Sequence, residues 1–464
     1  MGSGAPLSMG VRRRLVRGFG ANAFGNVVTV AIQIVSVPIF LRYWGSEVYG
    51  TWLVLTAIPA YLVMSDLGFG SVAANEMTMQ VARGDRQTAR EIFQSTWLFT
   101  VGVSIVVVAI AAVAIRLLPI SRWIHGSSIS DHDVRLIIVA FVLQVVFVLQ
   151  GLLIAAGFRC EGEYALSTVY SNLTRAGEAA AVMLAVLSGA PPSLAAFVFL
   201  FARAVLTFIM AVSLVRRHNW LSFGIGSASV KTVRRLAGPA FAFMAFPLGN
   251  AMSLQGFVAL IGVLLGPIAV VTFATLRTLS RVGFQLMAVI NNAVWPEVSA
   301  AIGAHDLVLT RKLHRSACQL AIWAGLLTVG VLWASGSTVV RIWTHGRVPF
   351  AGALFHGLLI VVIANSFWFT SSVVLLAANM HRKLALVYLS ATTCSLIAGY
   401  FLLPRFGLAI APPVLLIVDA ITVPFVLKRS LAITGDALPD FLKAVLRPPS
   451  VHHLTGGIHS VQAL

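Results

Sequence analysis

The sequence has little charge, and very little of it is negative. Only 10% of its 464 residues are charged, and 33 lysines and arginines outnumber 15 acidic residues. Soluble globular domains have about a quarter of their residues charged, so this composition excludes that class. Hydrophobic residues make up 58% of the chain, and the mean hydropathy is +0.91. The composition therefore predicts a polytopic membrane protein.

Cysteine is scarce as well. The three cysteines, Cys160, Cys318 and Cys394, are an odd number without metal-ligand spacing, so we expect no disulfide framework and no metal site. The chain also lacks a phosphate-cradling glycine loop and a catalytic triad, which argues against an enzyme and against a cofactor. No cleavage site follows the short basic start of the chain, so we expect that start to be retained.

The long apolar runs are about 20 residues in length and do not alternate with period two, which favours membrane-spanning helices over barrel strands. About twelve such helices are predicted, in an all-α fold. With the N-terminus inside, about 22 Lys and Arg lie on the cytoplasmic side against about 7 outside. We therefore expect a multi-pass protein of the bacterial inner (cytoplasmic) membrane with both termini in the cytoplasm. The predicted spans are residues 20–41, 49–70, 95–118, 135–157, 166–188, 193–215, 238–264, 267–294, 315–335, 352–379, 384–403 and 408–427.

The net charge of +18 comes mainly from basic residues at the ends of these spans. Their clustering is what membrane topology requires, so anionic lipid headgroups rather than nucleic acid are the expected partner.

The spans divide into two halves of six helices. The predicted parts are a cytoplasmic N-terminus 1–19, an N-terminal lobe 20–215, a cytoplasmic linker 216–237, a C-terminal lobe 238–427 and a cytoplasmic tail 428–464. A weak repeat at one constant offset supports two halves of the same orientation, which would enclose a central cavity and rock in alternating access. Its pairs are Gly45 with Gly266, Thr51 with Thr272, Glu76 with Glu297, Asp85 with Asp306, Arg90 with Arg311 and Ser95 with Ser316.

The most informative feature is positive charge inside the predicted helices. Arg175, Arg203, Arg277 and Arg281 lie in otherwise apolar spans with few acids to neutralise them. An arginine at a helix centre costs roughly 2.5–3.5 kcal/mol, so four cost about 10–14 kcal/mol unless they face protein, water or an anion. We therefore expect a polar lumen that receives a negatively charged substrate.

The eighth predicted span gives the most specific pattern. Arg277, Arg281, Gln285 and Asn292 recur at intervals of four, four and seven, which places them on one face of a helix. Arginine suits phosphate because its planar guanidinium donates two hydrogen bonds and keeps its charge. A pair one turn apart could clamp a pyrophosphate. The alternative is that these arginines satisfy backbone carbonyls or carboxylates at a helix interface.

Three acids also lie within predicted spans. Glu178 follows Arg175 by three residues, so these two can neutralise each other. Arg203 has no acid near it in sequence and is the better candidate for a cation in the lumen. Asp66, Glu178 and Asp419 are candidates to bind a coupling ion, H⁺ or Na⁺, or to pair with an arginine.

An acidic cluster in an outer loop suggests a function of another class. Asp131, His132 and Asp133 are consecutive, and membrane glycosyltransferases or polymerases carry an acidic pair in such a loop to hold a metal and a lipid phosphate. The loop around this cluster is short for such a site.

A series of glycines and polar residues recurs in a characteristic order along the chain. In the first half these residues are Asn22, Gly25, Asn26, Pro38, Leu41, Arg42, Gly45, Tyr49, Gly50, Asp66, Leu67, Gly68, Asn75, Gly84 and Asp85. In the second half they are Gly266, Pro296, Glu297 and Gly407. This order resembles that of bacterial polysaccharide flippases, the O-antigen and exopolysaccharide repeat-unit translocases of the multidrug/oligosaccharidyl-lipid/polysaccharide exporter superfamily.

This resemblance implies an inner-membrane flippase that moves an undecaprenyl-diphosphate-linked oligosaccharide from the cytoplasmic to the periplasmic leaflet. It implies a cationic cavity for the headgroup, a coupling ion or the membrane potential as energy source, and a polysaccharide polymerase and export machinery as further partners. The product would be lipopolysaccharide or exopolysaccharide. Relatives with lipid II specificity usually have two further helices, and drug exporters tend toward acidic cavities. A cation-coupled multidrug exporter and a glycosyltransferase remain the alternatives.

Overall fold

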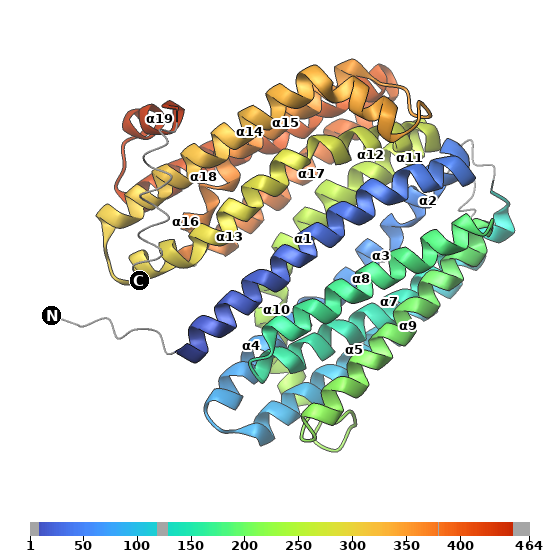
Figure 1. Ribbon diagram of the computed structural model, residues 1–464. Helices are drawn as coiled ribbons and strands as arrows, with labels where there is room; N and C mark the ends of the chain where they lie inside the picture. The colour runs from blue at the N-terminus through green and yellow to red at the C-terminus, as the bar shows by residue number, and fades with distance from the viewer. Residues whose placement is uncertain (1–8, 118–128, 379, 449–464) are drawn as a thin grey trace. The chain divides into compact units, whose positions relative to one another are not determined.

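The computed structural model describes residues 9–117, 129–378 and 380–448 (Figure 1). Its regular secondary structure within these ranges is entirely helical. The chain forms two compact units. Unit 1 comprises Met1–Ala251 and Gly266–Val271, and unit 2 comprises Met252–Leu265 and Thr272–Leu464. The predicted tail, residues 428–464, is described only as far as residue 448.

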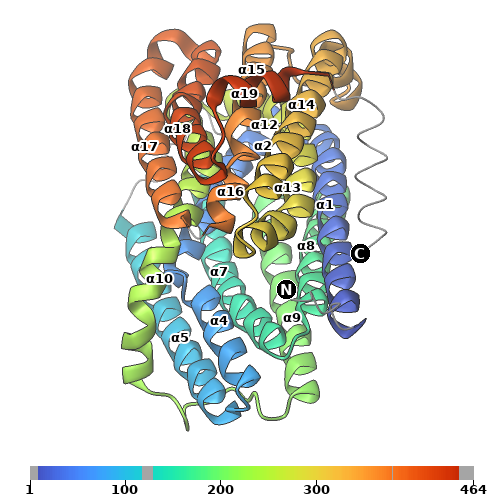
Figure 2. The ribbon, with the colours of Figure 1, turned by 90° about the vertical axis from the view of Figure 1, so that its left-hand side faces the viewer.

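Unit 1 is built around α7, which contacts α4, α5 and α9 (Figure 2). α7 is apolar on all sides, as expected of a helix surrounded by others. Its buried residues run from Val134 to Cys160. The helices of this unit are α1 (Met9–Tyr43), α2 (Gly45–Leu55), α3 (Ala57–Leu62), η1 (Val63–Asp66), α4 (Phe69–Ala82), α5 (Arg86–Leu117), α7 (Asp131–Cys160), α8 (Tyr164–Leu187), α9 (Pro192–Arg217) and α10 (Val230–Ala251).

A glycine lets α1 approach α8 closely. A Cβ atom at Gly25 would lie 2.6 Å from Nδ2 of Asn172. That amide nitrogen donates a hydrogen bond of 3.0 Å to the carbonyl of Ala21. Small residues permit such close backbone contact between membrane helices, and side-chain amides then hydrogen-bond across the contact.

A second close approach joins α2 to the first turn of α12, within unit 1. A Cβ atom at Gly50 would overlap the carbonyl of Pro267. Gly50 is buried, as is Pro267. This contact explains why Gly266–Val271 belongs to unit 1 although the chain on both sides belongs to unit 2.

Unit 2 holds the remaining helices, among which α15 contacts α14 and α18. Its last helix packs on α14, where the ring of Phe441 stacks 5.0 Å from that of His314. The helices of unit 2, apart from the first turn of α12, are η2 (Met252–Gly256, a π-helix), α11 (Phe257–Leu265), α12 (Pro267–Ser280), α13 (Val282–Gly303), α14 (Leu307–Trp343), α15 (Gly352–Phe369), α16 (Ser372–Ala377), α17 (His381–Phe406), η3 (Gly407–Ile410), α18 (Ala411–Thr434) and α19 (Leu438–Leu446).

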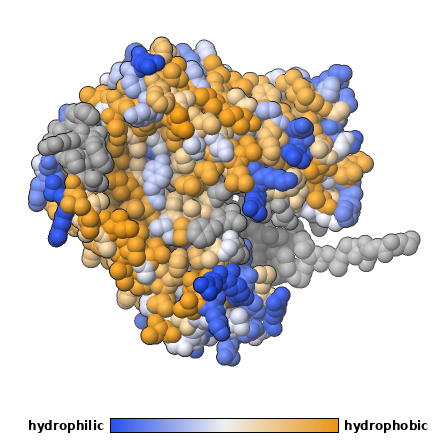
Figure 3. All heavy atoms as spheres, turned by 180° about the vertical axis from the view of Figure 1, so that it is seen from behind, coloured by the Kyte–Doolittle hydropathy of each residue, from blue (hydrophilic) through white to orange (hydrophobic). Residues whose placement is uncertain are grey.

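Within the described residues, every predicted span lies on one of these helices or on up to four in succession. Nine helical stretches in the described chain are long and apolar enough to cross a membrane, and one of them, Arg382–Thr434, contains both α17 and α18. Two predicted spans fall short of that criterion. α8 contains the polar residues Asn172, Arg175 and Glu178, and the eighth span is divided into the two shorter helices α12 and α13. Hydrophobic residues cover much of the face seen in Figure 3.

The sequence repeat falls on matching backbone positions. Gly45 and Gly266 have φ angles of 72° and 85°, a left-handed conformation that suits glycine. Asp85 and Asp306 both begin a long helix, and each carboxylate accepts a backbone N–H bond of 2.9 Å, from Thr88 and Leu309 respectively. Side-chain and backbone hydrogen bonds from Thr88 lower the pKa of Asp85. The repeated residues therefore include helix-capping positions.

Candidate functional site

Arg277 and Arg281 stand on consecutive turns where α12 gives way to α13. The backbone N–H of Arg281 donates to the carbonyl of Arg277 at 3.0 Å, and that of Gln285 donates to the carbonyl of Arg281 at 3.1 Å. These bonds keep the helical i→i+4 spacing across the break at Arg281. Arg277, Arg281 and Gln285 therefore occupy one face. The side chain of Asn292, predicted for the same face, lies outside the described part of the structure.

The guanidinium of Arg277 contacts the π-helix η2. Nη2 donates to the carbonyl of Ser253 at 2.9 Å, and Nη1 donates to that of Leu254 at 3.2 Å. Where a helix changes from i→i+4 to i→i+5 bonding, carbonyls lose their regular donors, so a guanidinium can satisfy them. Its central carbon also lies 5.3 Å from the ring centroid of Phe273. The structure thus gives Arg277 the carbonyl contacts of the alternative interpretation.

The described contact of Arg281 is with an aromatic ring. Its guanidinium carbon lies 5.2 Å from the ring centroid of Phe284, and Tyr388 of α17 is near both arginines. Within the described residues, neither Arg277 nor Arg281 forms an ion pair with a carboxylate. Two like charges one turn apart without an acid make this part of unit 2 attractive to an anion.

Arg203 in unit 1 is already paired. Its Nε and Nη2 atoms donate to the two oxygens of Glu178 at 2.5 and 2.6 Å, in a bidentate contact between α9 and α8. Gln144 of α7 donates a third hydrogen bond to Glu178 at 3.1 Å. No acid lies near Arg203 in sequence, but the fold supplies one from the neighbouring helix α8. The role of Arg203 in binding substrate stays a prediction.

Arg175 does not pair with Glu178, the acid three residues after it in α8. Its Nη1 atom instead donates to the hydroxyl of Thr29 on α1 at 2.8 Å, and its side chain is exposed. The predicted intrahelical pair is thus replaced by a contact between α8 and α1. The role of Arg175 in binding substrate remains a prediction.

The two aspartates of the predicted spans also lack an arginine partner among the described contacts. Both oxygens of Asp66 accept the backbone N–H of Gly70, at 3.2 and 3.0 Å, at the break between η1 and α4. Oδ1 of Asp419 accepts Nε1 of Trp368 at 2.7 Å and Nδ2 of Asn365 at 3.0 Å. Pairing with an arginine, one of the two roles expected of these aspartates, is formed by neither of them among the described residues. Their role in ion coupling stays a prediction.

The acidic loop cluster has a structural explanation. Ser130 caps α7 by accepting the backbone N–H of Asp133 at 3.1 Å, and its hydroxyl donates to the carboxylate of Asp133 at 2.7 Å. Asp131 and Asp133 both lie in the first turn of α7, where negative charge is favourable. No group of three or more His, Cys, Asp or Glu side chains suited to a metal occurs in the described chain.

No protein-family model and no curated protein sequence matches the chain. Solved structures do. An inward-facing MATE-family multidrug resistance transporter of the MOP superfamily has a TM-score of 0.75 at 12% identity, covering 89% of this chain and 96% of its own. An inward closed structure of the lipid II flippase MurJ has a TM-score of 0.70 at 13% identity, covering 92% and 90%. An outward-facing MATE transporter has a TM-score of 0.63 at 12% identity, covering 91% and 96%.

These likenesses confirm the predicted fold class. The chain is a multi-pass membrane protein, helical throughout the described residues, and it shares its fold with a MATE-family transporter of the MOP superfamily and with MurJ. A polysaccharide flippase is consistent with this fold. The similar proteins are a multidrug resistance transporter and a lipid II flippase, and a shared fold does not by itself determine what this chain binds.

Sequence reasoning missed the partners of the two arginines in unit 2. Ser253, Leu254 and Tyr388 were not singled out, because two of them contribute backbone carbonyls and the third lies on a helix more than 100 residues away. The π-helix left one signal in the sequence. Ser253 and Gln255, with Asn250 just before them, interrupt an apolar stretch between Pro247 and Gly266.

Proposed function

We propose that the protein is a flippase for oligosaccharides linked to undecaprenyl diphosphate, and that Arg277 and Arg281 bind the diphosphate of the headgroup. Translocation changes no covalent bond. The protein instead lowers the free energy required to move a charged, polar headgroup through hydrocarbon.

One observation carries this proposal. Arg277 and Arg281 lie on consecutive turns, and no carboxylate among the described residues neutralises them. Arginine keeps its charge inside proteins and donates several hydrogen bonds in a fixed plane, a geometry that suits phosphate oxygens. A diphosphate would supply the negative charge that no carboxylate of the described residues places beside this pair.

The two arginines differ in a way that sharpens the test. Arg277 also donates to the carbonyls of η2, so its loss would disturb the helix as well as the charge. The described contact of Arg281 is with the face of Phe284. Arg281→Gln therefore removes the charge with little expected change in backbone structure.

The experiment reconstitutes the purified full chain in liposomes and measures translocation of a fluorescent polyprenyl-diphosphate oligosaccharide. We expect Arg281→Gln to reduce the rate at least about tenfold, because a charge-assisted hydrogen bond contributes about 1.5–3 kcal/mol. Arg341→Gln, an exposed arginine at the end of α14, is the matched control and should transport normally. Wild-type transport by Arg281→Gln and by an Arg277→Ala/Arg281→Ala variant would refute the assignment.

A multidrug exporter is the second candidate, favoured by the TM-score of 0.75 to a MATE transporter. Such a protein would use acids to bind cationic drugs. The three candidate acids are engaged by neighbouring groups, Glu178 with Arg203, Asp66 with Gly70 and Asp419 with Trp368. Drug susceptibility of a deletion strain separates the two functions. Increased susceptibility with normal surface polysaccharide would favour the exporter.

A further inference from the structure

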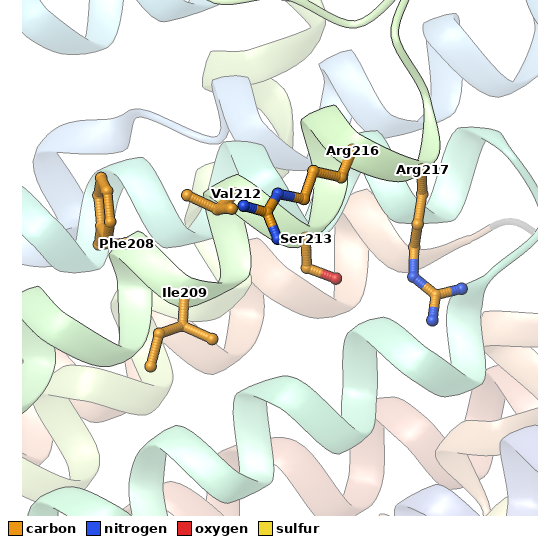
Figure 4. Close-up of a pocket in the computed structure, with 6 residues that line it drawn as sticks. All are labelled: Phe208, Ile209, Val212, Ser213, Arg216 and Arg217. Carbon is orange, nitrogen blue, oxygen red and sulfur yellow. The ribbon is translucent and has the colours of Figure 1, made fainter.

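The end of α9 forms a groove that combines apolar and basic side chains (Figure 4). The groove has a volume of about 400 Å³. It is lined by Phe208, Ile209, Val212, Ser213, Arg216 and Arg217. Phe208 and Ile209 are 69% and 50% exposed, as expected of side chains that contact lipid. Two arginines in the last turn place positive charge directly beyond this apolar surface.

The position of Arg216 follows from helix geometry. Side chains of an α-helix lean toward its N-terminus, so a residue in the last turn reaches back over the preceding turn. Figure 4 shows Arg216 running back toward Val212, with its guanidinium beside Val212 and Ser213. In a helix that crosses a membrane, this direction leads into the bilayer rather than toward water. The charge is thereby held close to the level at which lipid phosphates lie.

The other lining groups are suited to an anion. Arg217 points away from the guanidinium of Arg216 in Figure 4 and lies 3.5 Å from Oε1 of Glu163. No ion pair of Arg216 occurs in the described chain. The hydroxyls of Tyr170 and Ser213 are 2.8 Å apart. When Tyr170 donates in this pair, the proton of Ser213 is available to a phosphate oxygen.

We propose that this groove is a binding site for an anionic phospholipid. The phosphodiester binds Arg216 and Ser213, and an acyl chain lies along Phe208 and Ile209. Positive charge selects a lipid with net negative charge over a zwitterionic one, because a zwitterionic headgroup brings its own cation. The proposal concerns unit 1 alone and does not depend on the identity of the transported substrate.

The test measures retention of phosphatidylglycerol by the purified full chain in native mass spectrometry, with phosphatidylcholine as the comparison lipid. We expect tighter binding of phosphatidylglycerol and an approximately tenfold weaker affinity in Arg216→Gln, which loses a charge-assisted hydrogen bond. Ser213→Ala should weaken binding to a smaller extent. Arg234→Gln removes the same charge from an exposed position on α10 outside the groove and should bind as the wild type.

Equal retention of the two lipids would overturn the proposal, as would undiminished phosphatidylglycerol binding in Arg216→Gln. Displacement of phosphatidylglycerol by a lower concentration of a polyprenyl phosphate would also overturn it, by identifying the groove as a docking site for transported lipid. Should Arg216→Gln fail to fold, the lipid preference of the wild type and the affinity of Ser213→Ala decide the question.

Discussion

Arginine side chains within the helices of this protein bind different groups, depending on what surrounds each guanidinium. Arg203 is bound by Glu178, Arg175 by the hydroxyl of Thr29, and Arg277 by two backbone carbonyls. The free-energy penalty of burying each charge is offset locally and differently. For Arg277 and Arg281, at the junction of α12 and α13, the described contacts are with backbone carbonyls and aromatic rings rather than with a carboxylate.

Removing one member of the Glu178–Arg203 pair should destabilise unit 1. The side chains are 4% and 20% exposed, so a single substitution leaves a mostly buried charge without its partner. We expect Glu178→Ala to cost about 3 kcal/mol of stability, measured as a lower melting temperature in detergent. Substitution of both residues by apolar side chains should recover much of the loss. Additive effects in this double-mutant cycle would contradict a coupled pair.

Gly50 should tolerate no side chain. A Cβ atom there would overlap the carbonyl of Pro267, so Gly50→Ala forces two helices apart. We expect it to cost about 1–3 kcal/mol, measured as a fall in melting temperature. Gly102→Ala in α5 is the control, because no atom lies within 4 Å of its would-be Cβ. A melting temperature of Gly50→Ala equal to that of Gly102→Ala would show that the close approach is absent.

The sequence could identify these arginines but not their partners. Spacing within one helix predicts which residues share a face, as Arg277 and Arg281 do. It does not predict which side chain of another helix reaches that face. Glu178 is three residues from Arg175 and 25 from Arg203, yet it binds the more distant arginine. Tertiary packing decides such pairings, and no local rule contains that information.

At the scale of helices, η2 is the most unusual element. It is a π-helix of five residues between α10 and α11, and it begins at the residue where unit 2 begins. Short π-helical segments are uncommon and often occur at functional sites. Arg277 donates to two of its carbonyls, so a residue proposed to bind substrate also stabilises this irregular segment.

Loss of Arg277 should loosen η2. We expect the backbone amides of residues 252–256 to exchange hydrogen about tenfold faster in Arg277→Ala, because the carbonyls lose charge-assisted hydrogen bonds. Arg281→Ala should leave their exchange unchanged. Hydrogen exchange followed by mass spectrometry measures both. Equal protection of η2 in wild type and Arg277→Ala would mean that the guanidinium does not support this segment.

Helix positions were predictable because hydrophobicity specifies them. All twelve predicted spans coincide with helices, since an apolar run of about 20 residues has few other stable structures in a membrane. The irregularities were not predictable. The π-helix and the break at Arg281 depend on contacts that no periodicity records. The sequence analysis also did not identify Ser130 as the N-cap of α7, although it precedes the helix at the spacing typical of such a cap.

For the molecule as a whole, the distribution of basic residues predicts the orientation in the membrane. We expect both termini to be cytoplasmic. A C-terminal fusion to green fluorescent protein should therefore fluoresce, and a C-terminal fusion to alkaline phosphatase should be inactive. A fusion of the same phosphatase after residue 128, in the predicted outer loop, is the positive control. Active phosphatase at the C-terminus would reverse the predicted topology.

The fold could be inferred from sequence more completely than the substrate. Similar structures include both a drug transporter and a lipid II flippase, at 12% and 13% identity. A fold shared at such low identity depends on the pattern of apolar helices, whereas substrate choice depends on a few polar side chains. Those few residues carry the proposals for Arg277, Arg281 and Arg216.

The short stretch Gly266–Val271 has a consequence for how the protein is made. All other residues of unit 1 precede Met252 in the chain. The turn that packs against Gly50 is complete only when about twenty further residues have left the ribosome. During synthesis, therefore, unit 1 cannot complete its packing until Gly266–Val271, which follows α11, has been made. A nascent chain halted before Gly266 should remain open to protease at α2, whereas one halted beyond Val271 should resist.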